Sequence, residues 1–298
     1  MLSDLTDILQ LLKDAESYLV ERGVPNAKRN ADWLLAHVLG CRSPELYLSP
    51  YRVIDRAAVE TFRSLVRRRG EREPLQYILG SAEFMSLPFH MRQGVFIPRP
   101  DTEVLVERVE ALLRQRSRPP RTNDGRGAVA LLDLCCGTGV IGISLAFRLP
   151  QVVCTAVDVD ERAVALTLEN AALNGVEDRI RCVRRDAAEF LESEPGSYDA
   201  VVCNPPYIPT ADIGKLLPEV KDHEPRLGLD GGTDGLRFYR RVVPLLPGVV
   251  ASGGVVAFEI GVDEGRAVAD LLASEGFAGA EVHKDYGSQD RVVIARML

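Results

Sequence analysis

The segment LLDLCCGTGVIG, at residues 131–142, constrains the fold of this chain more than any other stretch. Gly137, Gly139 and Gly142 stand at GxGxxG spacing between one apolar run and the start of the next. This spacing is typical of a strand, a tight turn and a helix that together bind a nucleotide-like ligand. Glycine lets the backbone approach a ligand closely, and the first amides of the helix offer free hydrogen-bond donors. The segment therefore predicts an α/β fold.

Strand and helix patterns alternate from this turn onward. Strands are predicted at 129–134, 152–157, 180–183, 200–203, 255–260 and 292–295, and helices at 140–149, 161–173 and 265–274. Because strands and helices alternate, we expect a mainly parallel sheet with helices on both faces. Such sheets bind ligands at the carboxyl ends of their strands, where the strand order reverses.

The first part of the chain has a different pattern. Apolar residues such as Ile8, Leu12 and Leu19 recur at helical spacing,. The pattern then loosens into short alternating pieces around Gly80 and Gly94, which favours a hairpin or an irregular connector,. The predicted organisation is a helical domain at 1–72, a β-hairpin connector at 73–97 and an α/β domain at 98–298.

Composition limits the classes of function. The chain has 298 residues and a formal net charge of −7, which argues against sequence-independent binding to phosphate backbones as its main task,. No stretch approaches the ~20 apolar residues that span a bilayer, and the first residues lack the basic start and the unbroken apolar run of a secretion signal,. We therefore expect a monomer that has no membrane association and no stably bound nucleic acid.

The cysteines indicate a reducing compartment. Six of them are scattered along the chain without a CxxC pair, at Cys41, Cys135, Cys136, Cys154, Cys182 and Cys203. This is not the disulfide framework of a short secreted chain, so the cytoplasm is the expected location. No His or Cys stands at ligand spacing from the adjacent pair at 135 and 136, and we interpret that pair as small apolar residues.

An acid at the end of the next predicted strand supports ligand binding at the turn. Asp158 follows the glycines by about 20 residues, where the dinucleotide fold keeps an acid for ribose hydroxyls,. The two features together predict an adenosine-like ligand, although the glycines alone would also serve to pack a tight turn. Pyridine dinucleotides and S-adenosylmethionine share this architecture, so these residues leave both cofactor classes open.

The segment VVCNPPYIPT, at residues 201–210, ends an apolar strand with an amide, two prolines and a phenol. If this strand lies beside the glycine strand, Asn204 emerges at the ligand-binding edge of the sheet. Its side-chain oxygen accepts hydrogen bonds, and Pro205 and Pro206 leave carbonyl oxygens outside any ladder while they direct the loop. These acceptors suit the two hydrogens of an NH2 group, and the ring of Tyr207 is expected to pack on a planar substrate.

Such a clamp predicts a specific chemistry. When fixed acceptors hold both hydrogens, a pyramidal nitrogen is favoured and its lone pair points at a methyl group. Most of the gain comes from alignment, since well-oriented neighbours reach effective molarities of roughly 10⁵ to 10⁸ M. An isolated NPPY is more often a plain turn. Its position at a strand end, after a glycine turn and a ribose acid, favours the functional interpretation.

Two further segments admit a structural and a functional interpretation. PRPDTE, at 98–103, has the proline and the acidic residues typical of a helix start,. His223 and Glu224 lack the second histidine of a zinc motif, and 230–235 resembles a turn-rich loop and not a calcium site,. No metal is predicted.

Six motifs occur in the order typical of one enzyme family. They are EPLQYILGSAEFMSLPF, FIPRPDTEVLVE, DLCCGTGVIGISLA, NPPYI, EPRLGLDGGTDGL and DYGSQDRVV. In these motifs the chain resembles the HemK-type peptide-chain release factor glutamine methyltransferases, from about residue 73 to the C-terminal end, and the helical N-terminal part also fits. The resemblance implies a Rossmann-like S-adenosylmethionine-dependent methyltransferase domain with a mainly parallel seven-stranded sheet, preceded by a small all-helical domain that recognises the release factor. It also implies methyl transfer to the side-chain amide nitrogen of the glutamine in the GGQ motif of class I release factors.

The resemblance implies roles for individual residues and a site wall at 98–103. The implied cofactor-binding residues are Cys135, Cys136, Gly137, Thr138, Gly139, Asp158, Asp186 and Asn204. The glutamine would be held by Asn204, Pro205, Pro206 and Tyr207, with Asn204, Pro205 and Tyr207 as the catalytic group. Two positions depart from the family: Cys135 replaces a common glycine, and Ala187 stands where some relatives have a large aromatic residue over the adenine.

Three other functions remain as alternatives. An adenine amino-group methyltransferase acting on DNA or RNA would use the same clamp, but such enzymes usually need a basic surface and a device that extracts the base. An NAD-type oxidoreductase would explain the glycines and Asp158 but would leave NPPY without a role. A non-catalytic adaptor would need neither the cofactor residues nor the clamp.

Overall fold

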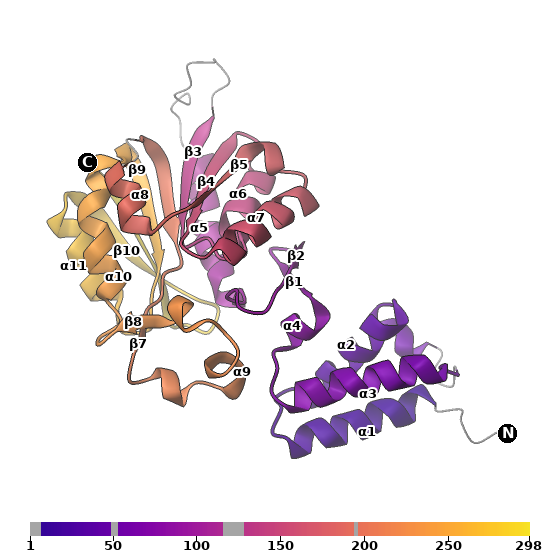
Figure 1. The fold of residues 1–298 in the computed structure, drawn as a ribbon. Helices are drawn as coiled ribbons and strands as arrows, with labels where there is room; N and C mark the ends of the chain where they lie inside the picture. Colours follow the sequence, from indigo (N-terminus) through magenta and orange to yellow (C-terminus); the bar gives the residue numbers. More distant parts are fainter. Residues whose placement is uncertain (1–6, 49–52, 116–127, 194–195) are drawn as a thin grey trace. The chain divides into compact units, whose positions relative to one another are not determined.

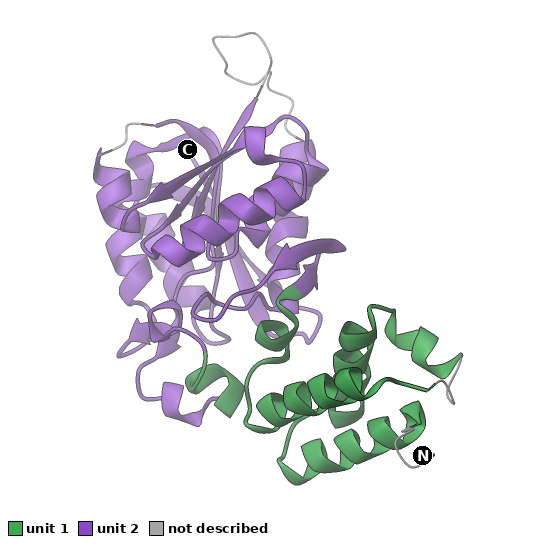
Figure 2. Cartoon of the chain, turned by 45° about the vertical axis from the view of Figure 1, so that its right-hand side comes forward, with its two compact units in different colours: residues 1–81, 217–223 green, residues 82–216, 224–298 purple. Residues whose placement is uncertain are grey.

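The chain forms two compact units (Figure 2). The computed structural model describes residues 7–48, 53–115, 128–193 and 196–298 (Figure 1). Residues 1–81 and 217–223 make up the first unit, which we call the helical unit, and residues 82–216 and 224–298 make up the second, the sheet unit. Residues 1–6 of the predicted helical domain lie outside the described part.

The helical unit is built from short amphipathic helices with defined ends. Its elements are α1 (Ile8–Glu21), α2 (Ala27–Leu39), the 3₁₀ turn η1 (Ser43–Tyr47), α3 (Arg56–Gly70), α4 (Leu75–Leu79) and α9 (Pro218–Lys221). Asp7 caps α1 by accepting a hydrogen bond from the Leu9 amide at 2.6 Å, and Asp55 caps α3 through the Ala58 amide at 2.8 Å,. The apolar stripes of these helices meet in one core that includes Ile8, Leu11, Leu19, Leu34, Leu35 and Phe62.

The helical unit extends beyond the boundary predicted from the sequence. Leu75 and Ile78 of α4 are buried in the core of this unit, so the boundary falls after residue 81 and not after 72. The predicted connector is thereby divided. Its hairpin, β1 (Ser81–Phe84) and β2 (Leu87–His90), leads into the sheet unit, where Phe84 and Phe89 are buried.

The sheet unit contains a seven-stranded sheet in the order β10-β11-β9-β6-β3-β4-β5 (Figure 1). The strands are β3 (Val129–Leu134), β4 (Val152–Asp158), β5 (Ile180–Arg184), β6 (Tyr198–Cys203), β9 (Val250–Glu259), β10 (Phe277–Lys284) and β11 (Asp290–Met297). β9, β6, β3, β4 and β5 are mutually parallel, and β11 is antiparallel to both of its neighbours. The mainly parallel seven-stranded sheet implied by the sequence is confirmed.

Helices cover both faces of this sheet. One face carries α5 (Glu103–Arg114), α6 (Val140–Arg148) and α7 (Glu161–Leu173), and the other carries α8 (Ala187–Ser193), α10 (Arg237–Val242), the 3₁₀ segment η6 (Val243–Gly248) and α11 (Gly265–Ser274). Alternate residues of a central strand enter alternate cores: Ala200 and Val202 of β6 pack in the first, and Val201 and Cys203 in the second. A strand buried on both faces reads as a continuous apolar run, as β6 does.

The elements that the sequence pattern missed are short or lie at an edge. β10 is an edge strand that is mostly exposed, and its sequence FAGAEVHK lacks a continuous apolar run. α8 and α10 have only seven and six residues, too few to establish a helical period,. The predicted helices at 161–173 and 265–274 and the strand at 129–134 are confirmed with the same limits.

Candidate functional site

The register of the central strands brings four residues together at the carboxyl edge of the sheet. Leu134 of β3 is the partner of both Val157 on β4 and Cys203 on β6, and Cys203 is also the partner of Phe258 on β9. The next residues along the chain are Asp158 at the end of β4, Cys135 just after β3, Asn204 just after β6 and Glu259 at the end of β9. The prediction that the strand before Asn204 lies beside the glycine strand is confirmed.

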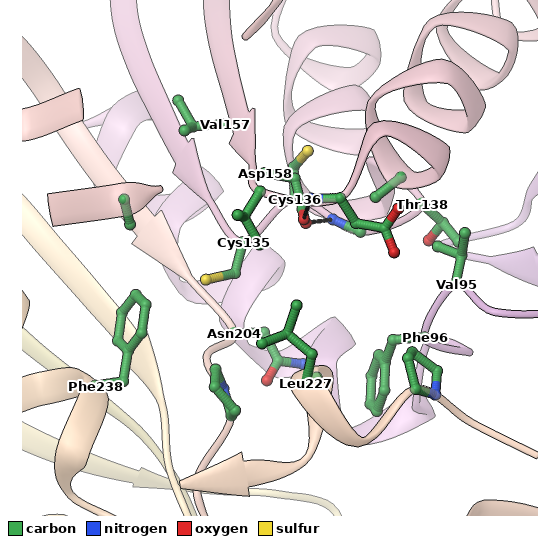
Figure 3. Close-up of a pocket in the computed structure, with 18 of the residues that line it drawn as sticks. Val95, Phe96, Cys135, Cys136, Thr138, Val157, Asp158, Asn204, Leu227 and Phe238 are labelled. Carbon is green, nitrogen blue, oxygen red and sulfur yellow. Dashed lines mark hydrogen bonds between the residues drawn. The ribbon is translucent and has the colours of Figure 1, made fainter. Parts of the chain in front are cut away.

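A cavity of about 260 Å³ opens at this edge (Figure 3). Of the residues predicted for the site, its lining includes Cys135, Cys136, Gly137, Thr138, Asp158, Asp186, Asn204 and Pro206. Gly139, Pro205 and Tyr207 do not line it. Figure 3 shows Phe96 and Phe238 on opposite sides of the view, with Asn204 between them.

The three glycines of the turn have different roles. A Cβ at Gly142 would lie 2.7 Å from Cys154 Sγ, and one at Gly139 would lie 2.7 Å from a threonine methyl on α7, so packing requires glycine at both positions. A Cβ at Gly137 would meet nothing closer than the Cys135 carbonyl oxygen at 4.0 Å. Of the three, Gly137 is the one that offers its backbone to the cavity.

Cys135 keeps the backbone conformation that glycine would adopt at this position. Its φ is 57°, in the left-handed region that side chains disfavour by roughly 1–2 kcal/mol,. Burial raises the pKa of the Cys203 thiol well above its usual range, and the neighbouring Cys135 thiol adds to that shift. The departure from glycine therefore adds a side chain to the cavity wall and leaves the turn in its left-handed form.

Asp158 is held so that its carboxylate remains available to a ligand. Its Oδ2 accepts a hydrogen bond from the Gly137 amide and its Oδ1 from the Asp160 amide, both at 2.9 Å. Burial raises the pKa of this carboxyl group, and the two amides oppose that shift. Because each carboxylate oxygen has two lone pairs, both oxygens can still accept from hydroxyl groups in the cavity.

Asp133 is a second buried acid behind the turn, and sequence reasoning gave it no role. Its Oδ2 accepts from the Gly142 amide at 2.9 Å, and its Oδ1 has no hydrogen-bond partner among the described residues. Burial, together with the charge of Asp158, raises the pKa of this carboxyl group to about 7. Asp133 therefore ties the start of α6 to β3.

Asp186 and an aromatic ring from a distant segment form another part of the wall. The Asp186 carboxylate accepts from the Ala188 amide at 3.0 Å and pairs with Arg241 at 2.7 Å. Ala187 leaves space next to this acid, and Phe238 of α10 lines the same cavity. Ala187 has no aromatic ring, so Phe238 supplies the aromatic surface in this part of the lining.

The NPPY segment carries two acceptors that have no donor among the described residues. Asn204 Nδ2 donates to Thr102 Oγ1 at 3.3 Å, and Asn204 Oδ1 accepts no hydrogen bond within the described chain. The Pro205 carbonyl likewise has no donor there. The Tyr207 hydroxyl donates to Glu259 Oε1 at 3.0 Å, and burial, reinforced by the adjacent carboxylate, raises the pKa of this phenol far above its usual range. Tyr207 is therefore a neutral donor.

The PRPDTE segment is both a helix start and a wall of the cavity. Residues Pro100–Thr102 form a 3₁₀ turn that leads into α5, and Pro98 and Thr102 line the cavity. Arg99 pairs with Glu224 at 2.6 Å, and the other oxygen of Glu224 accepts from the Ile97 amide at 3.2 Å. Glu224, which resembled half of a zinc motif, thus fixes this wall.

The GGTDG loop supports the NPPY segment from behind. β7 (Ile208–Pro209) pairs with β8 (Asp230–Gly232). A Cβ at Gly231 would lie 2.7 Å from the Tyr207 carbonyl carbon, and one at Gly235 would lie 2.5 Å from the Tyr207 carbonyl oxygen. Only glycine permits this approach, so the loop predicted as a turn has a specific packing role.

Several site residues were missed from the sequence. Among them are Glu259, Val95, Phe96, Leu227 and Phe238. Glu259 left a signal, because it is a charge at the end of the otherwise apolar run VVAFE. The others come from loops and a short helix without a periodic pattern, and only the folded chain brings them to the cavity.

The described residues contain neither a metal-binding cluster nor a membrane-spanning helix. No group of three or more His, Cys, Asp or Glu side chains among residues 7–48, 53–115, 128–193 and 196–298 could hold a metal ion. In the same ranges, no helix has both the length and the apolar character needed to cross a membrane.

Comparison with known proteins gives consistent matches along the chain. Residues 10–80 match the model of the PrmC N-terminal domain, and residues 111–217 match that of the methyltransferase small domain. The chain is 39% identical to the release factor glutamine methyltransferase of Geobacter sulfurreducens, over 99% of this chain and 98% of the relative. It is 37% identical to the protein of the same name from Chlorobaculum tepidum, over 95% of each chain.

One solved structure supports the fold alone. It is a 16S rRNA methyltransferase from T. thermophilus in complex with AdoMet and guanosine. The TM-score is 0.50 and the sequence identity 20%, over 73% of this chain and 50% of that one. The match agrees with the arrangement of sheet and helices described above.

Proposed function

The chain belongs to the release factor glutamine methyltransferase family, and from this premise we propose its reaction in detail. It transfers a methyl group from S-adenosylmethionine to the side-chain amide nitrogen of the glutamine in the GGQ motif of class I peptide-chain release factors. The observation that carries the proposal is the open pair of acceptors, Asn204 Oδ1 and the Pro205 carbonyl, next to a cavity with a ribose-type acid.

The residues of the cavity fit S-adenosylmethionine. Asp158 has free acceptor capacity for the two ribose hydroxyls, and the backbone at Gly137 faces open space where the methionine part would pass. Phe238 offers an aromatic surface for the adenine, and the Asp186 carboxylate lies in the same lining. When bound, S-adenosylmethionine supplies the methyl group as an electrophile on a positively charged sulfur.

The chain's own residues prepare the amide nitrogen for attack. In an amide, the nitrogen lone pair is delocalised into the carbonyl group. When Asn204 Oδ1 and the Pro205 carbonyl each accept one N–H hydrogen, the nitrogen is turned so that its lone pair faces the methyl group. With the cofactor bound, this nitrogen would take the methyl group as the S–C bond breaks, and it would then lose one proton to solvent, since neither the Asn204 oxygen nor the Pro205 carbonyl is basic enough to keep it.

Alignment and exclusion of water account for most of the expected rate gain. Positioning of reacting groups is worth effective molarities of roughly 10⁵ to 10⁸ M. The buried strand ends and the PRPDTE wall hold the acceptors in place, so little reorganisation accompanies the reaction. Tyr207, as a neutral phenol bonded to Glu259, holds the end of the NPPY loop, and its ring is proposed to pack on the glutamine side chain.

We assign recognition of the release-factor body to the helical unit. This unit exposes several apolar and aromatic side chains, including Trp33, Tyr47 and Leu48. Arg29 stacks on the Trp33 ring, with its guanidinium carbon 4.4 Å from the ring centroid. Exposed aromatic and arginine side chains are enriched at protein interfaces. Because release factors act at the ribosome, the proposed location is the cytoplasm, and the protein is proposed to act as a monomer without stably bound nucleic acid.

The direct test is mass spectrometry of an unmethylated release factor incubated with the protein and S-adenosylmethionine. The expected result is a mass gain of one CH2 unit confined to the peptide that carries the GGQ glutamine. A release factor with alanine in place of that glutamine is the control and should gain nothing. If the intact factor gains nothing while calorimetry shows cofactor binding, the proposed substrate is wrong and adenine amino groups of nucleic acids become the next substrates to test.

A further inference from the structure

We propose that Thr102 and Glu259 are positioning residues of the methyl-transfer site: they fix the orientation of the Asn204 amide and of the Tyr207 hydroxyl. The inference rests on the proposed function and extends it to two residues outside the NPPY motif. Neither residue is argued to touch the reacting atoms. Both act through side chains that hold the substrate.

The fold places both residues beside NPPY from distant parts of the sequence. Thr102 ends the 3₁₀ turn before α5 and is 1% exposed. Glu259 is the last residue of β9 and is fully buried. Cys203 of β6 and Phe258 of β9 are register partners on adjacent parallel strands. Asn204 and Glu259 each follow one of these partners, so the two residues come side by side at the carboxyl edge.

Two hydrogen bonds join the four side chains in pairs. Asn204 Nδ2 donates to Thr102 Oγ1 at 3.3 Å, and the Tyr207 hydroxyl donates to Glu259 Oε1 at 3.0 Å. Burial raises the pKa of Glu259, and the neighbouring Thr102 and Tyr207 hydroxyls oppose that shift. Glu259 Oε2 has no hydrogen-bond partner within the described residues. The carboxylate therefore has one hydroxyl donor, Tyr207, and a second hydroxyl, Thr102, nearby.

The chemistry of the carboxylate gives these contacts a direction. In its ionised form, which the two neighbouring hydroxyls favour against burial, Glu259 only accepts, and the single hydroxyl hydrogen of Thr102 is then expected to point toward it,. The Thr102 oxygen is then an acceptor for Asn204, which must present its NH2 group to Thr102. The Asn204 side-chain oxygen is left for the substrate. If the Asn204 side-chain amide were turned around, its N–H groups would face the N–H groups of the glutamine, and no hydrogen bond could form between them.

A purely structural role explains Glu259 poorly. A buried carboxylate carries a large desolvation cost, and removing the charge would reduce that cost. Arg291, whose charge lowers the pKa of Glu259, is already paired with Asp285 at 3.1 Å. A glutamine would fill the same volume at lower cost. It could, however, donate to Thr102 and reverse the set of bonds, so the need for an acceptor that cannot donate accounts for the acid.

The test compares matched variants of the full-length protein. Thr102→Val removes the hydroxyl and keeps the shape, Thr102→Ser keeps the hydroxyl, and Glu259→Gln keeps the shape but adds a donor. Thr155→Val, at a half-buried threonine of β4 that does not line the cavity, is the control for the chemical change. For each variant, kcat and KM are measured with a release factor, the Kd for S-adenosylmethionine is measured by calorimetry, and thermal unfolding is recorded.

Thr102→Val and Glu259→Gln are each expected to lower kcat about 10²-fold, as loss of a preorganised contact does, with KM and Kd changed less than about threefold. Thr102→Ser should retain most of the activity, and Thr155→Val all of it. Equal kcat for Thr102→Val and Thr102→Ser would overturn the inference, and so would a loss of kcat that follows cofactor affinity or unfolding. If Glu259→Gln does not fold, the two Thr102 variants still decide. A wild-type protein that leaves the GGQ glutamine unmodified would instead overturn the proposed function, and this inference with it.

Discussion

Buried charge is treated differently at Glu219 of the helical unit and at the carboxyl edge of the sheet unit. In the helical unit, Glu219 is paired through both oxygens, with Arg69 at 2.7 Å and with Arg72 at 2.5 Å. Burial would raise the pKa of Glu219, but the hydrogen bonds from the two arginines outweigh it and lower that pKa. In the sheet unit, burial raises the pKa values of Asp133, Asp158 and Glu259. Asp133 and Glu259 each keep one oxygen without a partner among the described residues.

This difference separates a carboxylate that is paired within the chain from carboxylates at the site that we propose binds the ligand. A buried ion pair holds its segment in place because the two charges are paired with each other, although Arg72 Nε has no hydrogen-bond partner among the described residues,. A carboxylate or an amide whose acceptors are left open costs stability, since its desolvation is not repaid within the chain. The open acceptors lie at the carboxyl edge of the sheet, where a ligand can satisfy them. Strain and unsatisfied groups are expected at such functional sites.

The largest predicted effect concerns the open acceptor of the proposed clamp. Replacing Asn204 with alanine should lower kcat by about 10³-fold, because the contact matters mainly while the nitrogen reacts. The Kd for S-adenosylmethionine should change less than about threefold. Steady-state kinetics and calorimetry on the same preparation measure both. Turnover close to that of the wild type would show that the edge is not a clamp.

The second effect is a pH dependence of stability caused by Asp133. Its pKa is about 7 in the folded protein against an ordinary value of 3.8, so folding favours the protonated form. The contribution of Asp133 to the free energy of unfolding is fully present below pH 3.8 and is lost as the pH rises through 7. Between pH 4 and 7 the loss from this group should be about 3 kcal/mol.

The variant Asp133→Asn removes this titration. Urea unfolding monitored by circular dichroism at several pH values gives the free energy of unfolding of both proteins. The difference between them should change by about 3 kcal/mol over that range, in favour of the variant at high pH. A constant difference would mean that Asp133 does not titrate there.

The third prediction breaks the satisfied pair of the helical unit. Replacing Glu219 with alanine leaves Arg69, whose side chain is 5% exposed, without its carboxylate partner. Breaking a buried pair typically costs 3–5 kcal/mol, and because Glu219 is partly exposed we expect about 2–3 kcal/mol. Trp33, the only tryptophan of the chain, lies in this unit and reports its unfolding by fluorescence.

The control for this variant is an exposed pair in the same unit. Glu60 bonds to Arg56 at 2.9 Å on the surface of α3. Glu60→Ala should shift the fluorescence transition by less than about 0.5 kcal/mol, as exposed helix pairs do. If the Glu219 variant shifts the transition no more than this control, the pair does not stabilise the unit.

The smallest predicted effect tests recognition by the helical unit. Trp33→Ala should raise the KM for the release factor about fivefold, equivalent to about 1 kcal/mol, and leave the Kd for S-adenosylmethionine unchanged. Leu168→Ala, at an exposed apolar residue of the sheet unit, is the control and should leave KM unchanged. An unaltered KM in the Trp33 variant would exclude this side chain from the interface.

Local sequence patterns were sufficient for the central part of the fold. Val129–Leu134, Glu161–Leu173 and Gly265–Ser274 have the predicted limits because each carries a complete period or a continuous apolar run. The order of glycine turn, ribose-type acid and NPPY was likewise visible, since each follows directly on a strand. The helices α8 and α10, of seven and six residues, could not be predicted, because so short a stretch does not define a helical period,.

What the sequence by itself determined is the set of chemical groups and their places at strand ends. The glycines, Asp158 and Asn204 could be assigned because a parallel sheet brings all its carboxyl ends to one edge. Only the tertiary structure decided which partners these groups have. That Phe238 lines the cavity near Ala187, that Glu224 holds Arg99, and that Glu259 receives the Tyr207 hydroxyl depend on residues far apart in the chain. Side-chain partners across such distances are set by strand register and packing, which no local pattern encodes.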